Sequence, residues 1–302
     1  VCDMCFTFRN IEQTLPPNPD KIFAEFLIDS AKLLQSRLKT IPQQTFSLPN
    51  RQIEDKKSIT SDHYGELFSK FDESAYFEEP KKLLAQRLER NQFDLNWFQG
   101  KKVLDSGCGN GRYSYALKSL GASKVIGIDL SEKNINDAKY RLSLRPLDGL
   151  SYKLANVSEL PFEESSFDYV FSNGVLHHTE VMEKGLNELL RVLKPGGKGF
   201  LMLINKPGGI HWDFIEICRV LTKDIHYSFM HDFFKVMNIP PHLRFLYLDH
   251  IMVPINIRLT SQEISEKLKN SGAESIRRYE RGADVDGQEK FNQYKASNIV
   301  WG

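Results

Sequence analysis

The sequence predicts an α/β protein built on a doubly wound parallel sheet. Between residues 101 and 205, short apolar segments alternate with segments whose apolar residues recur at helical spacing. The apolar segments are nearly continuous runs, which is typical of parallel strands covered by helices on both faces. A glycine-rich turn also joins the first expected strand to the first expected helix. Ligands of open parallel sheets bind beyond such strand ends, so this turn is the first candidate site.

The expected strands lie at residues 102–105, 124–129, 151–156, 167–171 and 199–204. Ser131 can cap the helix that follows the second strand. The helix before the fifth strand is expected to end at Pro195-Gly196-Gly197, because proline and glycine both disfavour helix. A capping box at Thr260-Ser-Gln-Glu263 starts a later helix. Two further strands are expected after it, near residues 274–279 and 296–301.

Changes in the residue pattern divide the chain into four parts. Residues 1–79 form an N-terminal helical extension, with a helix start at Asn18-Pro19-Asp20. Residues 80–205 form the sheet-building core. Residues 206–258 interrupt the alternation, are crowded with aromatic side chains, and are expected to form an inserted lid. Residues 259–302 resume the core pattern and complete it.

Composition excludes several classes of protein. Lys and Arg total 40 against 39 for Asp and Glu, a net charge of +1, so a partner bound by broad phosphate neutralisation is not expected. Four cysteines in 302 residues do not make a disulfide scaffold, and they favour a reducing, cytoplasmic location. No stretch approaches the ~20 apolar residues that span a bilayer. We therefore expect no nucleic-acid partner and no membrane span, with a homo-oligomer left open.

The Cys2-x-x-Cys5 pair is the one sequence pattern that raises the question of a metal. A structural zinc site usually needs four ligands, and no second pair lies near in sequence. The H-x-E spacing of zinc enzymes is also absent. We expect no metal site.

The glycine turn Asp105-Ser-Gly-Cys-Gly-Asn-Gly111 carries the main chemical signal. Dinucleotide folds use G-x-G-x-x-G with a pyrophosphate over the helix N-terminus. Here the spacing is G-x-G-x-G, and the Asp105 carboxylate beside the turn would repel a pyrophosphate. It would suit a ligand that carries an ammonium group and no phosphate, such as S-adenosylmethionine.

Asp129, at the end of the second expected strand, is the second signal. A carboxylate there can accept both hydroxyls of a ribose. NAD enzymes share this feature, so it does not identify the cofactor alone. The alternative interpretation is that Asp129 only caps the helix that starts at Ser131.

Five segments in order resemble the motifs of class I S-adenosylmethionine-dependent methyltransferases, whose sheet is Rossmann-like. They are similar to the small-molecule branch that includes ubiquinone and menaquinone biosynthesis enzymes. The resemblance covers roughly residues 80–205, with weaker support from 259–302. The segments are Val103–Gly111, Val125–Ser131, Asn156–Phe162, Phe167–His178 and Leu190–Gly197.

The resemblance implies roles for residues of the cofactor pocket. Asp105, Gly107 and Gly109 would hold the methionine end of the cofactor, the glycines through their backbone. Cys108, inside the turn, is expected to be a small packing residue of the same pocket. Ser106 replaces a frequent small apolar residue, a departure of little consequence.

The other end of the cofactor is assigned in the same way. Asp129 would bind the ribose hydroxyls and Leu130 would pack on the adenine. Asn156 and Val157 would meet the adenine edge, with Asn156 standing where Asp is common; its amide oxygen can still accept from the adenine amino group. Asn173 would lie near the transferred methyl.

Methyl transfer is an in-line displacement that requires alignment and exclusion of water. An acceptor that starts protonated also needs a base. Our candidates are His177 and His250, with His178 and Asp213 also considered. The alternative for His177 and His178 is that they only shape the loop after the fourth strand.

Aromatic residues of the lid are candidates for substrate contact: Trp212, Phe229 and Tyr247. Tyr64 and Tyr76 of the N-terminal extension could close the other side of the pocket. An aromatic lid suits an apolar or cationic substrate. A hydrophobic clamp or a dimer contact is an equally good interpretation of the same aromatic residues.

The resulting hypothesis is methyl transfer from S-adenosylmethionine to a small molecule, with S-adenosylhomocysteine as product and the acceptor atom left open. A tRNA or protein methyltransferase on the same fold is one alternative. A non-catalytic S-adenosylmethionine-binding partner module is another. An NAD dehydrogenase is disfavoured by Asp105 and by the glycine spacing.

Overall fold

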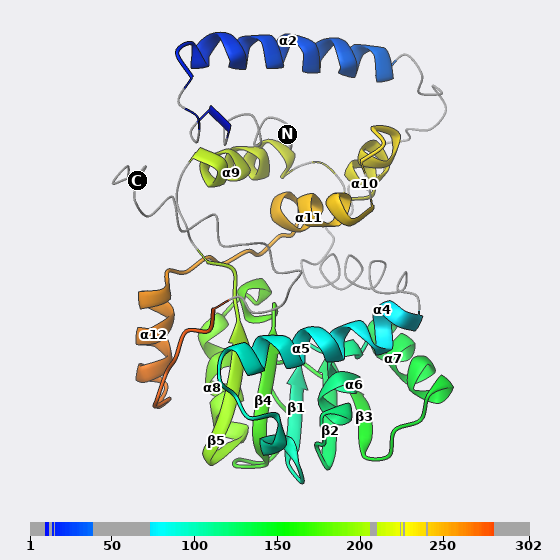
Figure 1. Cartoon of the computed structure of the whole chain (residues 1–302), viewed down its shortest axis with the longest axis vertical. Coiled ribbons are helices and arrows are strands. Elements are labelled where there is room, and N and C mark those ends of the chain that lie inside the picture. Colours follow the sequence, from blue (N-terminus) through cyan, green and yellow to red (C-terminus); the bar gives the residue numbers. More distant parts are fainter. Residues whose placement is uncertain are drawn as a thin grey trace. The chain divides into compact units, whose positions relative to one another are not determined.

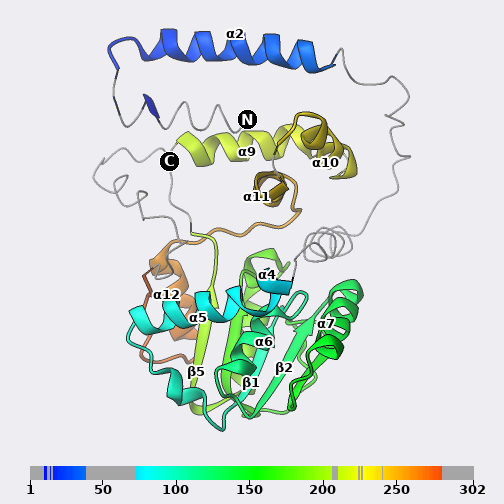
Figure 2. The same ribbon diagram turned by 45° about the vertical axis from the view of Figure 1, so that its right-hand side comes forward.

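A computed structural model describes residues 10–11, 14, 16–38, 73–205, 210–223, 225, 227–239 and 241–280 (Figures 1 and 2). The chain forms two compact units. One unit comprises Val1–Glu54, Pro207–Val253 and Tyr294–Gly302. The other comprises Asp55–Lys206 and Pro254–Gln293 and contains the sheet.

The second unit contains a five-stranded parallel sheet in the order β3-β2-β1-β4-β5. This confirms the predicted doubly wound α/β fold. The chain builds the sheet outward from β1 in one direction and then returns to β4 beside β1, so the strand order reverses between these two strands. Ligands of such sheets bind at this reversal, beyond the carboxyl ends of the strands. The strands are β1 (Lys102–Ser106), β2 (Lys124–Asp129), β3 (Leu150–Leu154), β4 (Phe167–Asn173) and β5 (Leu193–Met202).

Successive strand residues supply two apolar cores, one on each face of the sheet. Val103 packs in the core that holds Leu88 and Leu117, whereas its neighbour Leu104 packs in the core that holds Leu186. This alternation is the two-residue period of a strand. The first core is covered by α5 (Glu79–Arg90), η1 (Leu95–Phe98), α6 (Arg112–Ser119) and α7 (Glu132–Leu144), and the second by α8 (Met182–Val192).

The predicted helix starts in this unit are confirmed. The Ser131 hydroxyl accepts the N–H of Asn134 at the start of α7. Thr260 and Glu263 form a capping box at the start of α12 (Ser261–Asn270). These caps satisfy N–H groups that the first turn of a helix leaves without a partner. A parallel bridge between Asn205 and Leu259 joins the two ends of the chain segment that leaves the sheet.

The structure changes two strand predictions. The fifth strand runs from Leu193 to Met202 instead of from residue 199 to residue 204. Pro195-Gly196-Gly197, which was expected to end the preceding helix, lies inside this strand, where the pairing with Phe167 and Tyr169 is irregular. The third strand ends at Leu154 instead of continuing to residue 156.

The strand expected at 274–279 is wrong, since these residues are outside any strand. The Asn91 side-chain amide bonds both the N–H and the carbonyl of Glu280, at 3.0 and 2.9 Å. These bonds fix the chain directly after the segment that was predicted to be a strand. The strand expected at 296–301 lies outside the described residues.

The first unit contains α2 (Pro19–Leu38), which begins at the predicted Asn18-Pro19-Asp20 signal. It also contains α9 (Ile210–Thr222), α10 (Tyr227–Val236) and α11 (Pro241–Ile251). α11 packs against both α9 and α10. Arg219 of α9 donates to the carbonyls of His250 and Val253, which fixes the end of α11. None of the described helices is both long and apolar enough to cross a membrane.

Candidate functional site

The glycine turn lies between β1 and α6 and is bound tightly to the end of β2. The N–H groups of Gly107 and Cys108 both donate to the carbonyl of Ile128, at 2.8 and 2.7 Å. The N–H of Gly109 donates to Asp129 Oδ2 at 2.8 Å. These amides are therefore used inside the protein. A ligand held by the backbone of Gly107 or Gly109 would be held through carbonyl oxygens, which are acceptors and suit an ammonium group.

Two glycines of the turn are required by their protein neighbours. Gly107 has φ +78°, and a Cβ there would lie 2.2 Å from a methyl of Val175. Gly111 has φ +88°, and a Cβ there would lie 2.5 Å from the ring of Tyr152. Left-handed backbone combined with a close neighbour leaves glycine as the only residue that fits. Contacts within the protein are thus enough to require glycine at these two positions.

Asp129 holds both the glycine turn and the start of α7. Its Oδ2 accepts from Gly109, while its Oδ1 accepts from the Ser131 N–H at 2.9 Å and from Asn134 Nδ2 at 3.3 Å. Burial raises the pKa of its carboxyl, and these hydrogen bonds oppose that shift. Leu130, the next residue, is 47% exposed. An exposed leucine beside an acceptor-rich carboxylate fits an apolar ring attached to a sugar.

Asp105 is enclosed, being only 1% exposed. The Ser114 hydroxyl of α6 donates to its Oδ2 at 2.5 Å. Burial raises the pKa of Asp105 to about 7; the Ser114 hydrogen bond opposes this and the negative charge of Asp129 adds to it. Cys108 is buried beside it, and burial also raises the pKa of the thiol well above its usual value. Cys108 therefore has the position of a packing residue and does not favour a thiolate.

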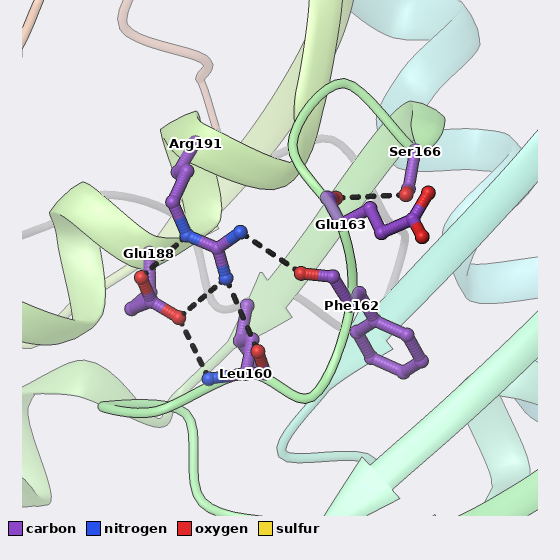
Figure 3. A network of polar contacts seen from close by, with 6 residues as sticks. All are labelled: Leu160, Phe162, Glu163, Ser166, Glu188 and Arg191. Atoms are coloured by element: carbon purple, nitrogen blue, oxygen red, sulfur yellow. Dashed lines mark hydrogen bonds and ion pairs between the residues drawn. The ribbon is translucent and has the colours of Figure 1, made fainter.

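The segment after β3 is held from outside by a pair of charged residues (Figure 3). Glu188 of α8 accepts the Leu160 N–H at 2.7 Å, and Arg191 donates to the carbonyls of Leu160 and Phe162 at 3.1 and 2.8 Å. Arg191 and Glu188 also pair with each other at 2.6 Å. We call residues 156–162 the adenine loop, after its predicted role.

Asn156 and Val157 begin this loop. The Asn156 Oδ1 accepts the N–H of Ser158 at 2.9 Å, which closes a tight turn. This turn is the reason that β3 ends before residue 156. Val157 is buried in the core beneath α8. Their contact with an adenine edge stays a prediction.

The end of β4 carries Asn173, followed by η2 (Leu176–His178). His177 is 2% exposed, and His178 is partly exposed. His178 Nδ1 lies 2.8 Å from the carbonyl of Ile255, and the Ile257 N–H donates to the carbonyl of His177. The segment 254–257 therefore fixes both histidines.

Comparison with known proteins assigns part of the chain to a family. Residues 104–201 match the family described as "Methyltransferase domain". This match covers about a third of the chain, and these residues are therefore a methyltransferase domain. Every main-chain turn and carboxylate described above, from the end of β1 to the end of β4, belongs to this domain.

Three relatives show how far the similarity reaches. The 27-O-demethylrifamycin SV methyltransferase of Amycolatopsis mediterranei (strain S699) is 34% identical over 148 residues, which are 47% of this chain and 53% of that protein. The tRNA U34 carboxymethyltransferase of Campylobacter hominis is 39% identical over 103 residues, 34% of this chain and 36% of that protein. The mitochondrial ubiquinone biosynthesis O-methyltransferase of Homo sapiens is 39% identical over 110 residues, 35% of this chain and 30% of that protein. The matches span about half of the first relative and about a third of the other two.

The methyltransferase domain brings the predicted cofactor residues together at the ends of β1, β2 and β4. The predicted substrate residues lie outside residues 104–201. Tyr76 of α4 (Glu73–Phe77) is fully buried, and its hydroxyl donates to the carbonyl of Asn110 at 2.6 Å. This corrects the prediction that Tyr76 faces the substrate, because a ring without exposed surface offers no contact.

The remaining predicted contacts lie outside the methyltransferase domain. Phe229 and Tyr247 pack in an apolar cluster of the first unit. His250 of α11 lies in that unit too, with Nδ1 3.8 Å from Asp249. Their approach to a substrate stays a prediction. Tyr64 and the Trp212 side chain lie outside the described residues, as do Cys2 and Cys5.

Several residues of the methyltransferase domain site had no separate signal in the sequence. Ser114 and Asn134, which bond the two carboxylates, look like ordinary polar positions of α6 and α7. Arg191 stands in a recognised motif, but the motif does not show that its guanidinium bonds loop carbonyls 29 and 31 residues away.

Proposed function

We propose that this chain transfers a methyl group from S-adenosylmethionine to a small-molecule acceptor and releases S-adenosylhomocysteine. The observation that carries the proposal is the end of β2 in a methyltransferase domain. There, Asp129 is fixed by the Gly109 and Ser131 amides, and Leu130 lies exposed beside it.

The residues present fit this cofactor. Asp129 Oδ2 accepts one backbone N–H and can accept a ribose hydroxyl as a second donor; at Oδ1, the other hydroxyl of the diol would take the place of the longer bond from Asn134 Nδ2, at 3.3 Å. The exposed Leu130 side chain gives the adenine an apolar surface. The Asp129 carboxylate at the turn disfavours a pyrophosphate and favours a ligand with positive charge. When bound, the cofactor supplies a methyl group on a cationic sulfur.

The protein's own contribution is alignment and proton removal. Asn173, at the end of β4, is the residue that we expect nearest to the transferred methyl. His178 is well suited to take a proton from the substrate that receives the methyl group. A carbonyl oxygen only accepts, so the bond to Ile255 places the His178 proton on Nδ1 in the neutral ring, and Nε2 is then the acceptor nitrogen. His177 and His250 remain candidates from the sequence.

A small-molecule acceptor is supported by the names of two relatives, a rifamycin precursor methyltransferase and a ubiquinone biosynthesis O-methyltransferase. The net charge of +1 also favours it over a nucleic acid. We propose that residues 206–258 contact the acceptor through the aromatic side chains named above. A cytoplasmic location and a homo-oligomer remain predictions.

A tRNA acceptor is the second candidate, because another relative is a tRNA U34 carboxymethyltransferase. Binding of tRNA that weakens steeply between low and moderate salt would favour it. Tight binding of tRNA together with methyl transfer to it would replace the small-molecule proposal.

Calorimetry tests the cofactor directly. We expect S-adenosylmethionine and S-adenosylhomocysteine to bind and NADH to give no heat of binding. Binding of NADH alone would overturn the proposal. Binding of S-adenosylhomocysteine without turnover on any acceptor would support a non-catalytic module instead.

A further inference from the structure

Tyr76 connects the N-terminal extension to the glycine turn. It lies on α4, 34 residues before Asn110, yet its hydroxyl donates to the Asn110 carbonyl at 2.6 Å. Both residues are buried, at 0% and 1% exposure. A buried carbonyl needs a donor, and this hydroxyl therefore helps to hold the Asn110 peptide in place.

Asn110 is held at its side chain as well. Its Nδ2 donates to Asp137 Oδ2 at 3.3 Å, and the same oxygen accepts from Arg141 Nε at 3.0 Å. The Arg141 guanidinium in turn lies 4.6 Å from the centre of the Tyr76 ring. Tyr76, Arg141 and Asp137 therefore enclose Asn110 from two elements, α4 and α7.

The next peptide is fixed in the same manner. The Tyr152 hydroxyl donates to the carbonyl of Gly111 at 3.1 Å. Two tyrosines thus hold two consecutive carbonyls at the start of α6. The Gly109 N–H that fixes Asp129 lies two peptides before the Asn110 carbonyl. A shift of Asn110 would move that N–H and release the carboxylate.

We propose that Tyr76 is a positioning residue for the cofactor: through the Asn110 carbonyl, it keeps the glycine turn in the conformation that presents Asp129 to the ribose. The inference rests on the proposed function. It assigns part of the N-terminal extension to cofactor binding. Tyr76 itself does not touch the ligand, so its effect is on the fraction of molecules whose turn is ready to bind.

Tyr76→Phe removes only the hydroxyl. If the turn is then competent in about one molecule in ten, the dissociation constant for S-adenosylhomocysteine rises about tenfold. The matched control is Tyr169→Phe, which removes a hydroxyl from another buried tyrosine that packs against Phe93 and Phe98. We expect this control to bind S-adenosylhomocysteine as the wild type does.

Hydrogen exchange provides a readout that a general loss of stability would not give. In Tyr76→Phe without ligand, we expect faster exchange confined to peptides that cover residues 107–112, below the temperature at which either variant unfolds. Tyr169→Phe should leave these peptides unchanged. Equal changes in both variants would show that Tyr76 only supports the core.

The outcomes separate the two proposals. If wild-type protein binds no S-adenosylhomocysteine, the proposed function fails. If wild type binds and Tyr76→Phe binds equally well with unchanged exchange in the turn, the positioning role fails while the function stands. If Tyr76→Phe does not fold, Arg141→Lys, which keeps the charge and shortens its reach over the ring, tests the same arrangement by the same two measurements.

Discussion

The two sides of the predicted cofactor pocket are stabilised in different ways. The glycine turn is fixed by bonds among buried groups, with side chains of Val175 and Tyr152 where a Cβ would need to lie. The adenine loop is fixed from outside by Arg191, whose side chain is 34% exposed, and by Glu188 at 21%. At Gly107 and Gly111 the turn has no room for a Cβ, whereas the loop is held by groups that water can reach.

This difference predicts how each side responds to change. Close packing fails abruptly, because one added carbon forces the backbone to move. Partly exposed charge pairs contribute modestly, and water can replace part of what they supply. We therefore expect the turn to be intolerant and the adenine loop to be adjustable. Four changes test this expectation, in order of decreasing effect.

Gly109→Val should abolish cofactor binding. Gly109 has φ +54°, a conformation that a β-branched residue strongly disfavours, and its N–H is the donor to Asp129. Calorimetry with S-adenosylhomocysteine should show no binding. Gly100→Val is the control, because Gly100 also has positive φ (+74°) but lies outside the turn with nothing within 4 Å of its Cβ position. Normal binding by Gly109→Val would refute the proposed rigidity of the turn.

Asp129→Ala should weaken binding by ~2 kcal/mol, the scale of losing charge-assisted hydrogen bonds. The same titration measures it. Asp168→Ala provides a control at another carboxylate, which lies at the other end of β4 and pairs with Lys194 at 2.7 Å. An unchanged affinity in Asp129→Ala would contradict the ribose assignment.

Asp105 should make the fold less stable as pH rises. The folded protein keeps the Asp105 proton to about pH 7, whereas the carboxyl of the unfolded chain loses it near 3.8. Between these values the unfolded state binds fewer protons, so the free energy of unfolding falls with pH and levels off above 7. Asp105→Asn should flatten this part of the profile, measured as thermal midpoints from pH 5 to 8. Identical slopes in both proteins would contradict the buried, neutral carboxyl.

The contribution of Glu188 to the free energy of unfolding should rise with pH, because its hydrogen bond to Arg191 lowers the pKa of its carboxyl. Arg191→Met should therefore reduce stability mainly above the ordinary pKa of a glutamate. Its effect on S-adenosylhomocysteine affinity should stay below about 1 kcal/mol, the range of partly exposed pairs. Complete loss of binding in Arg191→Met would show that the adenine loop is as intolerant as the turn.

Much of the fold was predictable because it depends on local patterns. The apolar runs from Lys102 and from Lys124 specify strands, and Ser131 specifies a cap, whatever the rest of the chain does. Asp129 was predictable as well, since the end of a parallel strand has a known place in the fold. The motif order then identified the methyltransferase domain.

The rest depends on contacts between distant residues. The spacing of residues around Tyr76 gives no indication that its hydroxyl meets a carbonyl 34 positions later, and its aromatic ring suggested a substrate contact instead. The extended run at 274–279 looks like a strand because its pattern suits one. Only the structure shows that this run stays outside the sheet and that Asn91 bonds the next residue, Glu280, at both its N–H and its carbonyl.

The bridge between Asn205 and Leu259 has a practical consequence for engineering. The chain leaves the sheet at Asn205 and returns at Leu259, and these two residues pair with each other. The stretch between them is therefore an insertion whose two ends meet. A short connector across that gap would leave the strand order intact. Exchanging this stretch with that of a relative would test whether it carries the proposed contacts with the acceptor.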